Sequence, residues 1–170
     1  MQDRFELKNS KIISTRAFNR DDFESLVAFF KELSRESMRF GLHYDRARLE
    51  RLASYPERDL ILLAFDGNRI VGVAAVCGSP LLEDRGIADF IVYIHQDYQN
   101  QGLGTYLTKT ILGEAKSKGY HRITLQVVAE NVPGIKAYEK AGFVVEGRMK
   151  DRHFGDDELY HDVLVMGIIL

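Results

Sequence analysis

Gln99-Asn100-Gln101-Gly102-Leu103-Gly104 decides the fold, because it lies between two contrasting sequence patterns. An apolar run from Ile87 to Ile94 predicts a strand before it, and a helical spacing predicts a helix after it, with Leu103, Leu107, Ile111 and Ala115 on one face. Glycines at such a turn let the backbone approach a ligand, and the N–H groups at the start of a helix attract phosphate. The stretch therefore predicts a phosphate-binding turn, with a tight turn that binds nothing as the alternative.

The patterns on either side of this turn predict further strands and helices. Before it, we expect strands at 12–18, 60–65 and 70–77. We also expect one helix that begins near Asn19 and a second, shorter helix that begins at Asp45 and ends before Pro56. Asp66-Gly67-Asn68 predicts a hairpin turn. After it, we expect a strand around 123–127, a short helix between Pro133 and Gly142, and strands at 143–148 and 160–170. This order favours an α/β fold in which a mixed sheet of about seven strands carries helices on both faces.

Length and composition favour a single globular domain that spans residues 1–170. The 170 residues include 23 basic and 25 acidic side chains, and a net charge of −2 gives no electrostatic footprint for nucleic acid. Cys77 is the single cysteine, so no disulfide can form within the chain and a reducing compartment is expected. Neither a signal peptide nor an apolar run of about 20 residues is found. We expect a cytoplasmic protein that binds no nucleic acid and no membrane.

The glycine-containing turn and a second motif resemble the GNAT superfamily of N-acetyltransferases. The family's Gln/Arg-x-x-Gly-x-Gly/Ala signature matches Gln99 to Gly104, and its Asn followed by Tyr-x-Lys-x-Gly-Phe matches Asn131 and the run from Tyr138 to Phe143. His161 to Met166 is similar to a strand that is common near the end of these enzymes. The resemblance covers residues 12–170. It implies a GNAT-like fold of mostly antiparallel strands around a central parallel pair that splays apart, with about four helices.

Carried over residue by residue, the resemblance implies that acetyl-CoA is the acyl donor. It would lie between the strand that ends near Ile94 and the strand that starts after Arg122, with Tyr138 as the general acid for the departing thiolate. Many relatives carry Arg or Lys where this chain has Asn100 and Gln101, so phosphate binding would depend more on backbone amides. The residues expected to contact the cofactor are Val92, Tyr93, Ile94, Gln99, Asn100, Gln101, Gly102, Leu103, Gly104, Thr105, Asn131, Ala137 and Tyr138.

Transfer to an amine also requires a base, because an amine of pKa ~10.4 is almost fully protonated at neutral pH and its free form costs roughly 4 kcal/mol. Asp89 stands where many members of the superfamily have a glutamate. Its side chain is one methylene shorter, so we expect it to act through water. Glu130, His95 and Glu83 are reserve candidates. The alternatives are a solvated strand-end carboxylate for Asp89 and a core aromatic for Tyr138.

Three further features are interpreted without additional chemistry. The five histidines are scattered without metal-ligand spacing, so no metal site is expected. Cys77 lies in an apolar run and is interpreted as an inert buried thiol. The acidic run from Asp156 to Glu158 is interpreted as a solvated hairpin turn, with attraction of a cationic amine as the alternative.

The acceptor is the least constrained part of the function. Residues 29–40 and Ala88-Asp89-Phe90 look like parts of Pat-type protein-lysine acetyltransferases, which favours a lysine or N-terminal amine of a protein. The alternatives are a small amine, such as a polyamine, an amino acid or an antibiotic, and a non-catalytic module that binds acyl-CoA as a regulatory ligand. The resemblance also implies a homodimer in which the C-terminal strands form the contact between subunits.

Overall fold

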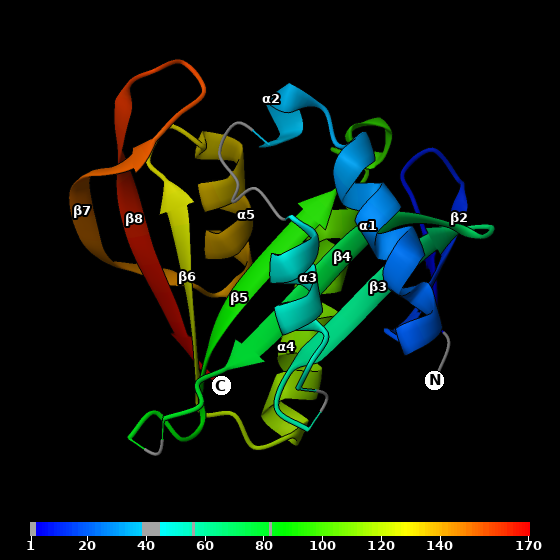
Figure 1. Cartoon of the computed structure of the whole chain (residues 1–170), viewed down its shortest axis with the longest axis horizontal. Coiled ribbons are helices and arrows are strands. Elements are labelled where there is room, and N and C mark those ends of the chain that lie inside the picture. The colour runs from blue at the N-terminus through cyan, green and yellow to red at the C-terminus, as the bar shows by residue number, and fades with distance from the viewer. Residues whose placement is uncertain (1–2, 39–44, 56, 82) are drawn as a thin grey trace.

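The computed structural model describes residues 3–38, 45–55, 57–81 and 83–170. Eight strands form one sheet in the order β1-β2-β3-β4-β5-β6-β8-β7 (Figure 1), and β5 and β6 form its parallel pair. The remaining neighbours are antiparallel, so the predicted mixed sheet with a central parallel pair is confirmed. The strands are β1 (Asp3–Glu6), β2 (Ile12–Ala17), β3 (Leu60–Asp66), β4 (Arg69–Gly78), β5 (Ile87–Ile94), β6 (Arg122–Val128), β7 (Val144–Phe154) and β8 (Tyr160–Ile169).

Helices cover both faces of the sheet, and each face has its own apolar core. The α-helices are α1 (Phe23–Glu32), α2 (Arg35–Met38), α3 (Arg46–Leu52), α4 (Leu103–Ser117) and α5 (Val132–Ala141), and two 3-10 turns are η1 (Arg20–Asp22) and η2 (Gln96–Tyr98). Figure 1 shows α1 and α3 in front of the sheet and α4 behind it. Leu107 and Ile111 pack in the core under α4, whereas Leu26 and Leu49 pack in the core under α1 and α3. None of the described helices has the length and hydropathy to cross a membrane.

The described residues contain one strand and one helix that the sequence did not predict. β1 has a single apolar side chain, Phe5, so it lacks the alternation that marks a strand. α2 is one four-residue turn, which is too short to show a helical period. The turn at Gly67, by contrast, has a φ of 59° and joins β3 to β4 as a hairpin, as predicted. Arg39, Phe40 and Pro56, on which two predictions depended, lie outside the described residues.

β1 and the turn after it lie against the glycine-containing segment. The Phe5 ring stacks on Tyr106 of α4, with centroids 4.4 Å apart. A Cβ atom on Gly102 would stand 3.5 Å from the tip of the same Phe5 ring. The Lys8 N–H donates a 3.3 Å hydrogen bond to the Gln101 carbonyl. The N-terminal hairpin therefore packs against the glycine-containing turn.

A buried ion pair fixes the chain where it enters α1. Both terminal nitrogens of Arg16 donate to the Asp22 carboxylate, at 2.6 and 2.7 Å, and the Asn19 N–H donates to the same carboxylate at 2.8 Å. Asp22 is only 8% exposed. The Arg16 hydrogen bond and, less strongly, the Asn19 N–H lower the pKa of Asp22 from its usual value.

We expect Asp22→Asn to lower the free energy of unfolding by about 1–2 kcal/mol at pH 7, because hydrogen bonds to a charged partner are lost. A carboxyl with a lowered folded pKa stabilises the fold above its unfolded pKa of about 3.9 and loses this effect as the pH falls. Urea unfolding at pH 7 and pH 3 should therefore show a difference between variant and wild type that shrinks at the lower pH. Asp21→Asn is the control, because Asp21 is exposed, and an equal loss at both pH values would contradict the prediction.

Candidate functional site

The central parallel strands separate soon after they meet. β5 and β6 pair only at Ile87–Arg122, Ala88–Ile123 and Asp89–Thr124, although the strands continue to Ile94 and Val128. On their far sides, β5 stays paired with β4 and β6 with β8 along their lengths. Figure 1 shows the two arrows diverging from their common lower end. Beyond Asp89, the facing edges therefore have backbone groups that no neighbouring strand satisfies, and the predicted residues Val92, Tyr93 and Ile94 lie on one of these edges.

The glycine-containing turn follows β5 directly and begins α4. Asn100 and Gly102 both have left-handed backbones, with φ of 60° and 90°. Asparagine and glycine are the residues that adopt this conformation most readily, which explains why this short sequence can make so tight a turn. Gly102 is the N-cap of α4 and provides no side-chain hydrogen bond to the helix. The first N–H groups of α4, at Leu103, Gly104 and Thr105, are therefore available to an anion.

Gln99 contributes to this site in a way that its position in the motif did not predict. Its side-chain amide donates to the Ile94 carbonyl at 3.0 Å and to the Ser37 hydroxyl at 3.1 Å. It therefore ties the turn to the end of β5 and to α2. Asn100 is exposed and Gln101 is half-buried.

Tyr138 lies on α5 at the edge of the core behind the sheet. Its ring makes edge contacts with Phe90 of β5 and Phe143, with centroids 6.1 Å away in each case. Burial raises the pKa of Tyr138 to about 12, so the phenol keeps its proton across the neutral range. Ala137 precedes it on the same helix and is half-buried. The two interpretations of Tyr138 are compatible, because the ring is a core aromatic and the hydroxyl is a protonated donor.

Asn131 begins α5 as its N-cap. Its side-chain oxygen accepts the Gly134 N–H at 3.1 Å. A Cβ on Gly134 would stand 2.7 Å from the Asn131 amide nitrogen, so this cap requires the glycine. Capping occupies the Asn131 oxygen and leaves its amide nitrogen for a ligand. Gly142 closes the helix with a φ of 102°, as predicted.

Asp89 faces the opposite side of the sheet from Tyr138. Phe90, its neighbour in β5, packs in the core with α4 and α5, whereas Ile91 packs with α1. Alternation along a strand therefore places the Asp89 side chain on the α1 side. The Thr124 hydroxyl donates to the Asp89 carboxylate at 2.6 Å, at the last position where β5 and β6 pair. Thr124 was missed from the sequence, because nothing local indicates which residue of another strand lies beside Asp89.

The three reserve candidates for a base are less well placed. His95 is 2% exposed, and its Nε2 lies 2.9 Å from an Arg69 nitrogen. Glu130 lies 3.5 Å from a ring nitrogen of His161. Glu83 is exposed in the turn before β5.

Burial raises the pKa of Cys77 to about 12, so this thiol stays protonated at neutral pH.

The acidic turn between β7 and β8 takes part in ion pairs. The Asp157 carboxylate lies 2.9 Å from His161 Nε2, while Glu130 approaches the other ring nitrogen. The Asp157 hydrogen bond, followed by other contacts including Glu130, raises the pKa of His161. Asp156 lies 3.8 Å from the Arg35 guanidinium of α2. The turn is thus held by its own partners and is not simply solvated.

We expect His161→Gln to lower the melting temperature at pH 6 more than at pH 9. A histidine with a raised folded pKa stabilises the fold below its unfolded pKa of about 6.5, and this effect is lost as the pH rises through the folded pKa. Thermal unfolding at constant ionic strength measures it. His121→Gln is the matched control, because His121 is exposed and no carboxylate is paired with its ring among the contacts of the described residues. The same loss at both pH values would show that His161 acts only through packing.

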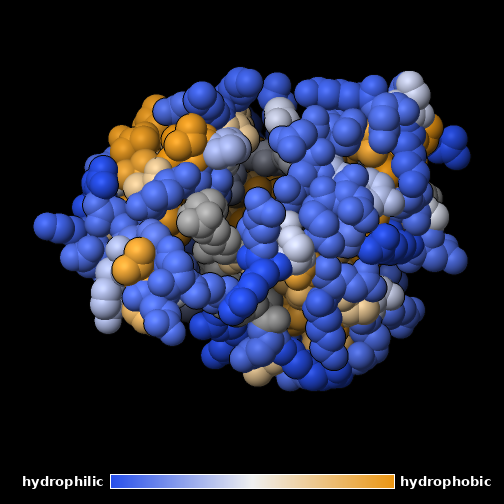
Figure 2. Space-filling view, turned by 90° about the horizontal axis from the view of Figure 1, so that it is seen from above, coloured by the Kyte–Doolittle hydropathy of each residue, from blue (hydrophilic) through white to orange (hydrophobic). Residues whose placement is uncertain are grey.

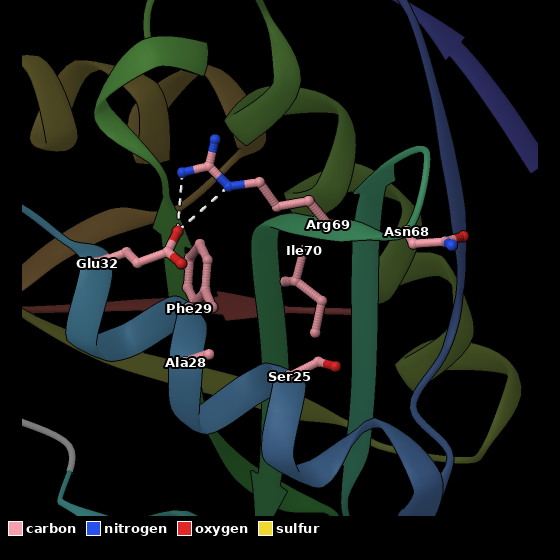
Figure 3. A pocket seen from close by; sticks show the side chains of 7 residues that line it. All are labelled: Ser25, Ala28, Phe29, Glu32, Asn68, Arg69 and Ile70. Carbon is pink, nitrogen blue, oxygen red and sulfur yellow. Dashed lines mark hydrogen bonds and ion pairs between the residues drawn. The ribbon is translucent and has the colours of Figure 1, made fainter.

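The surface has two further features besides the splayed strands. A cavity of about 150 Å³ lies between α1 and the β3–β4 turn (Figure 3), with Phe29 and Ile70 beneath and the Arg69–Glu32 ion pair at its edge. Figure 2 shows apolar side chains gathered on the side of the molecule where β7 and β8 lie. The large exposed apolar residues of these strands and their turn are Val144, Val145, Phe154, Leu159, Tyr160 and Ile169.

The sequence matches a known family over most of its length. The family model described as "Acetyltransferase (GNAT) family" matches residues 24–143. A mycothiol acetyltransferase of Corynebacterium glutamicum is 30% identical over 131 residues, which cover 72% of this chain and 43% of the relative. The L-amino acid N-acyltransferase MnaT of Escherichia coli is 27% identical over 99 residues, or 58% of this chain and 55% of that protein. The chain thus spans less than half of the mycothiol enzyme.

Solved structures agree with this fold. A GNAT-family acetyltransferase from Streptococcus pneumoniae superposes with a TM-score of 0.80 and 27% identity, covering 93% of this chain and 99% of that one. The GNAT domain of S. lividans PAT gives a TM-score of 0.81 over 99% of this chain and 97% of that one. At 19% identity, the second likeness shows the fold alone.

Proposed function

Because this chain belongs to the acetyltransferase (GNAT) family, we propose that it transfers an acetyl group from acetyl-CoA to a small primary amine. One observation carries the proposal. β5 and β6 do not pair beyond Asp89–Thr124, and Tyr138 lies on the α5 side of these strands whereas Asp89 lies on the α1 side. An acid and a base on the two sides of this unpaired stretch suit direct attack by an amine on a thioester.

The residues on the α4 side fit the acyl donor. The uncapped start of α4 presents N–H groups from Leu103 onward to a pyrophosphate, and the glycines at 102 and 104 add no side chains of their own to the turn. The open edge of β5 from Val92 to Ile94 presents backbone groups that suit the amides of a pantetheine arm. Asn131 contributes its amide nitrogen from the N-cap of α5, and Ala137 and Tyr138 lie farther along the same helix. Neither Asn100 nor Gln101 has a charge, so phosphate binding rests on the backbone.

The bound donor supplies an activated thioester, and this chain supplies proton transfer. The amine nitrogen forms a bond to the carbonyl carbon, and the carbon–sulfur bond breaks with its electron pair going to sulfur. Asp89, an exposed carboxylate, receives through a water molecule the proton that the ammonium group must lose before it attacks, and passes it to solvent. The attacking nitrogen loses its second proton to solvent as the amide forms. The Tyr138 hydroxyl gives its proton to the departing sulfur and regains one from solvent. Acetamide product, free thiol and one released proton result, so the protons balance.

The acceptor is proposed from the relatives. Those compared above are named for mycothiol and for L-amino acids, which are small molecules. They favour a small amine over the protein lysine or N-terminal amine that the sequence suggested, since the likeness to PAT extends to the fold alone. We therefore propose an amino acid or a similarly small primary amine as acceptor.

A two-part experiment tests the proposal. Calorimetric titration with acetyl-CoA, with ATP as the control nucleotide, measures donor binding. A colorimetric thiol-release assay then compares L-methionine, L-phenylalanine and spermidine with two peptides, one with an internal lysine and one with a free N-terminal alanine.

Micromolar binding of acetyl-CoA, together with faster thiol release from a small amine than from either peptide, is the expected result. Faster release with a peptide would restore the protein acceptor. Binding without thiol release from any amine would favour the non-catalytic acyl-CoA module. Failure to bind acetyl-CoA at millimolar concentration would refute the donor assignment.

A further inference from the structure

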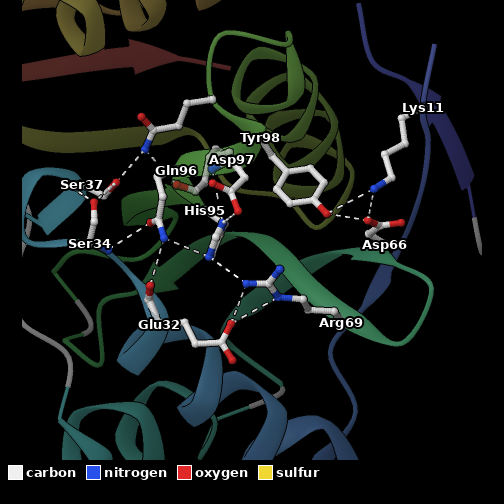
Figure 4. Close-up of polar contacts among 12 residues, drawn as sticks. Lys11, Glu32, Ser34, Ser37, Asp66, Arg69, His95, Gln96, Asp97 and Tyr98 are labelled. Atoms are coloured by element: carbon white, nitrogen blue, oxygen red, sulfur yellow. Dashed lines mark hydrogen bonds and ion pairs between the residues drawn. The ribbon is translucent and has the colours of Figure 1, made fainter. Parts of the chain in front are cut away.

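Gln96 makes an unusual set of contacts just before the glycine-containing turn. It lies on η2, directly after β5, and its side chain reaches the junction between α1 and α2 (Figure 4). Its oxygen accepts the Ser34 N–H at 3.0 Å, and its nitrogen donates to the Glu32 carbonyl at 3.1 Å. A side-chain amide can donate and accept at the same time, as a backbone peptide group does. Gln96 therefore holds the Ser34 N–H and the Glu32 carbonyl of the α1–α2 junction together.

A second glutamine holds the other end of the same junction. Gln99, three residues later, donates to the Ser37 hydroxyl at 3.1 Å. The Ser34 hydroxyl bonds to the Ser37 hydroxyl at 3.0 Å and accepts the Ser37 N–H at 3.1 Å. The first turn of α2 is therefore one hydrogen-bonded unit attached to the segment 96–99 at two points.

A buried histidine behind Gln96 restricts its position. Its amide nitrogen lies 3.0 Å from Nε2 of His95, and the Arg69 guanidinium lies 2.9 Å from the same ring nitrogen. Arg69 in turn donates to the Glu32 carboxylate at 2.8 Å. His95 is 2% exposed, so the Gln96 amide has a rigid neighbour and cannot turn away freely. Figure 4 shows these groups converging between α1 and η2.

We propose that Gln96 is a positioning residue that couples the donor-binding turn at residues 99–105 to the α1–α2 junction, which lies on the same side of the sheet as Asp89. The inference rests on the proposed function, because it assigns the donor to residues 99–105. A ligand that orders this turn also orders segment 96–99, and the two glutamines pass the restraint to Ser34 and Ser37. Linkage makes the effect reciprocal: whatever orders the junction must strengthen donor binding by the same factor.

The test measures hydrogen exchange of the backbone amides at 33–38, with and without saturating acetyl-CoA. In the wild type, we expect acetyl-CoA to slow this exchange at least about fivefold, which is the lower end of the range in which two coupled sites usually affect each other. Gln96→Met keeps the length of the side chain but removes both hydrogen bonds, and Gln96→Glu keeps only the acceptor for Ser34. In both variants, we expect slowing of less than about twofold, while calorimetry finds acetyl-CoA affinity within about tenfold of wild type.

Asp97→Asn is the matched control, because it lies on the same turn with a side chain that is 70% exposed. It should retain the wild-type slowing. Melting temperatures of all variants separate coupling from general loss of structure, since a merely structural role would speed exchange equally with and without acetyl-CoA. Equal slowing in Gln96→Met and wild type would overturn the coupling while leaving the donor assignment intact. Absence of acetyl-CoA binding to the wild type would overturn both.

Discussion

Tyr138→Phe is expected to lower kcat about 100-fold, within the range by which a positioned general acid accelerates a reaction. The variant loses the hydroxyl and keeps the ring, so the edge contacts with Phe90 and Phe143 remain. We therefore expect acetyl-CoA affinity, measured by calorimetry, to stay within about twofold of wild type, because the change affects a proton needed only as the sulfur leaves. Steady-state thiol release, with an amine that the wild type acetylates, measures kcat.

Tyr55→Phe is the control for this substitution. Tyr55 is 45% exposed and lies before β3, where its ring stacks with Arg58. It should leave kcat unchanged. If Tyr138→Phe also left kcat unchanged, Tyr138 would be a core aromatic without a catalytic part, and the departing sulfur would take its proton from water.

Phe143→Ala is expected to lower the free energy of unfolding by about 3–5 kcal/mol, as for other large aromatic residues removed from a core. Phe143 is 2% exposed and lies between the sheet and α5, with the Phe90 ring 5.9 Å and the Tyr138 ring 6.1 Å away. The cavity left behind would also free Tyr138 to move, so kcat should fall in the same variant. Urea unfolding monitored by circular dichroism measures the stability.

Phe154→Ala provides the comparison, because it removes the same side chain at a 58% exposed position on β7. Its partner is the Tyr160 ring, 5.0 Å away. We expect this variant to lose less than about 1 kcal/mol, as a cross-strand pair at the surface does. Similar losses in the two variants would mean that the core under α5 is less well packed than the contacts of Phe143 indicate.

The parts of the site that were predicted from the sequence are those with local causes. The glycine-containing turn between β5 and α4 and the end of α5 at Gly142 each follow from a residue and its immediate neighbours. Hydrophobic spacing likewise located α4 and the strands around it. The motifs then placed donor-binding candidates on the open edge of β5.

The parts that were missed depend on contacts between distant segments. Ser34 lies 62 residues before Gln96, and Asp89 lies 35 residues before Thr124. Neither pair has a spacing that predicts contact, because it is the sheet order that brings the partners together. β1 was missed for another reason: its pairing with β2 compensates for a sequence with little strand character of its own.

The position of β1 determines how this chain should be handled in the laboratory. Phe5 lies against Tyr106 and Gly102, and the Lys8 N–H is bonded to Gln101. An affinity tag or fusion partner joined directly before β1 would therefore pull on the turn at residues 99–105, the proposed donor site, and is expected to weaken acetyl-CoA binding. Leu170, whose N–H bonds to the His121 carbonyl, lies at the joined end of the splayed strands, away from that turn. Purification handles and immobilisation chemistry belong at this C-terminal end.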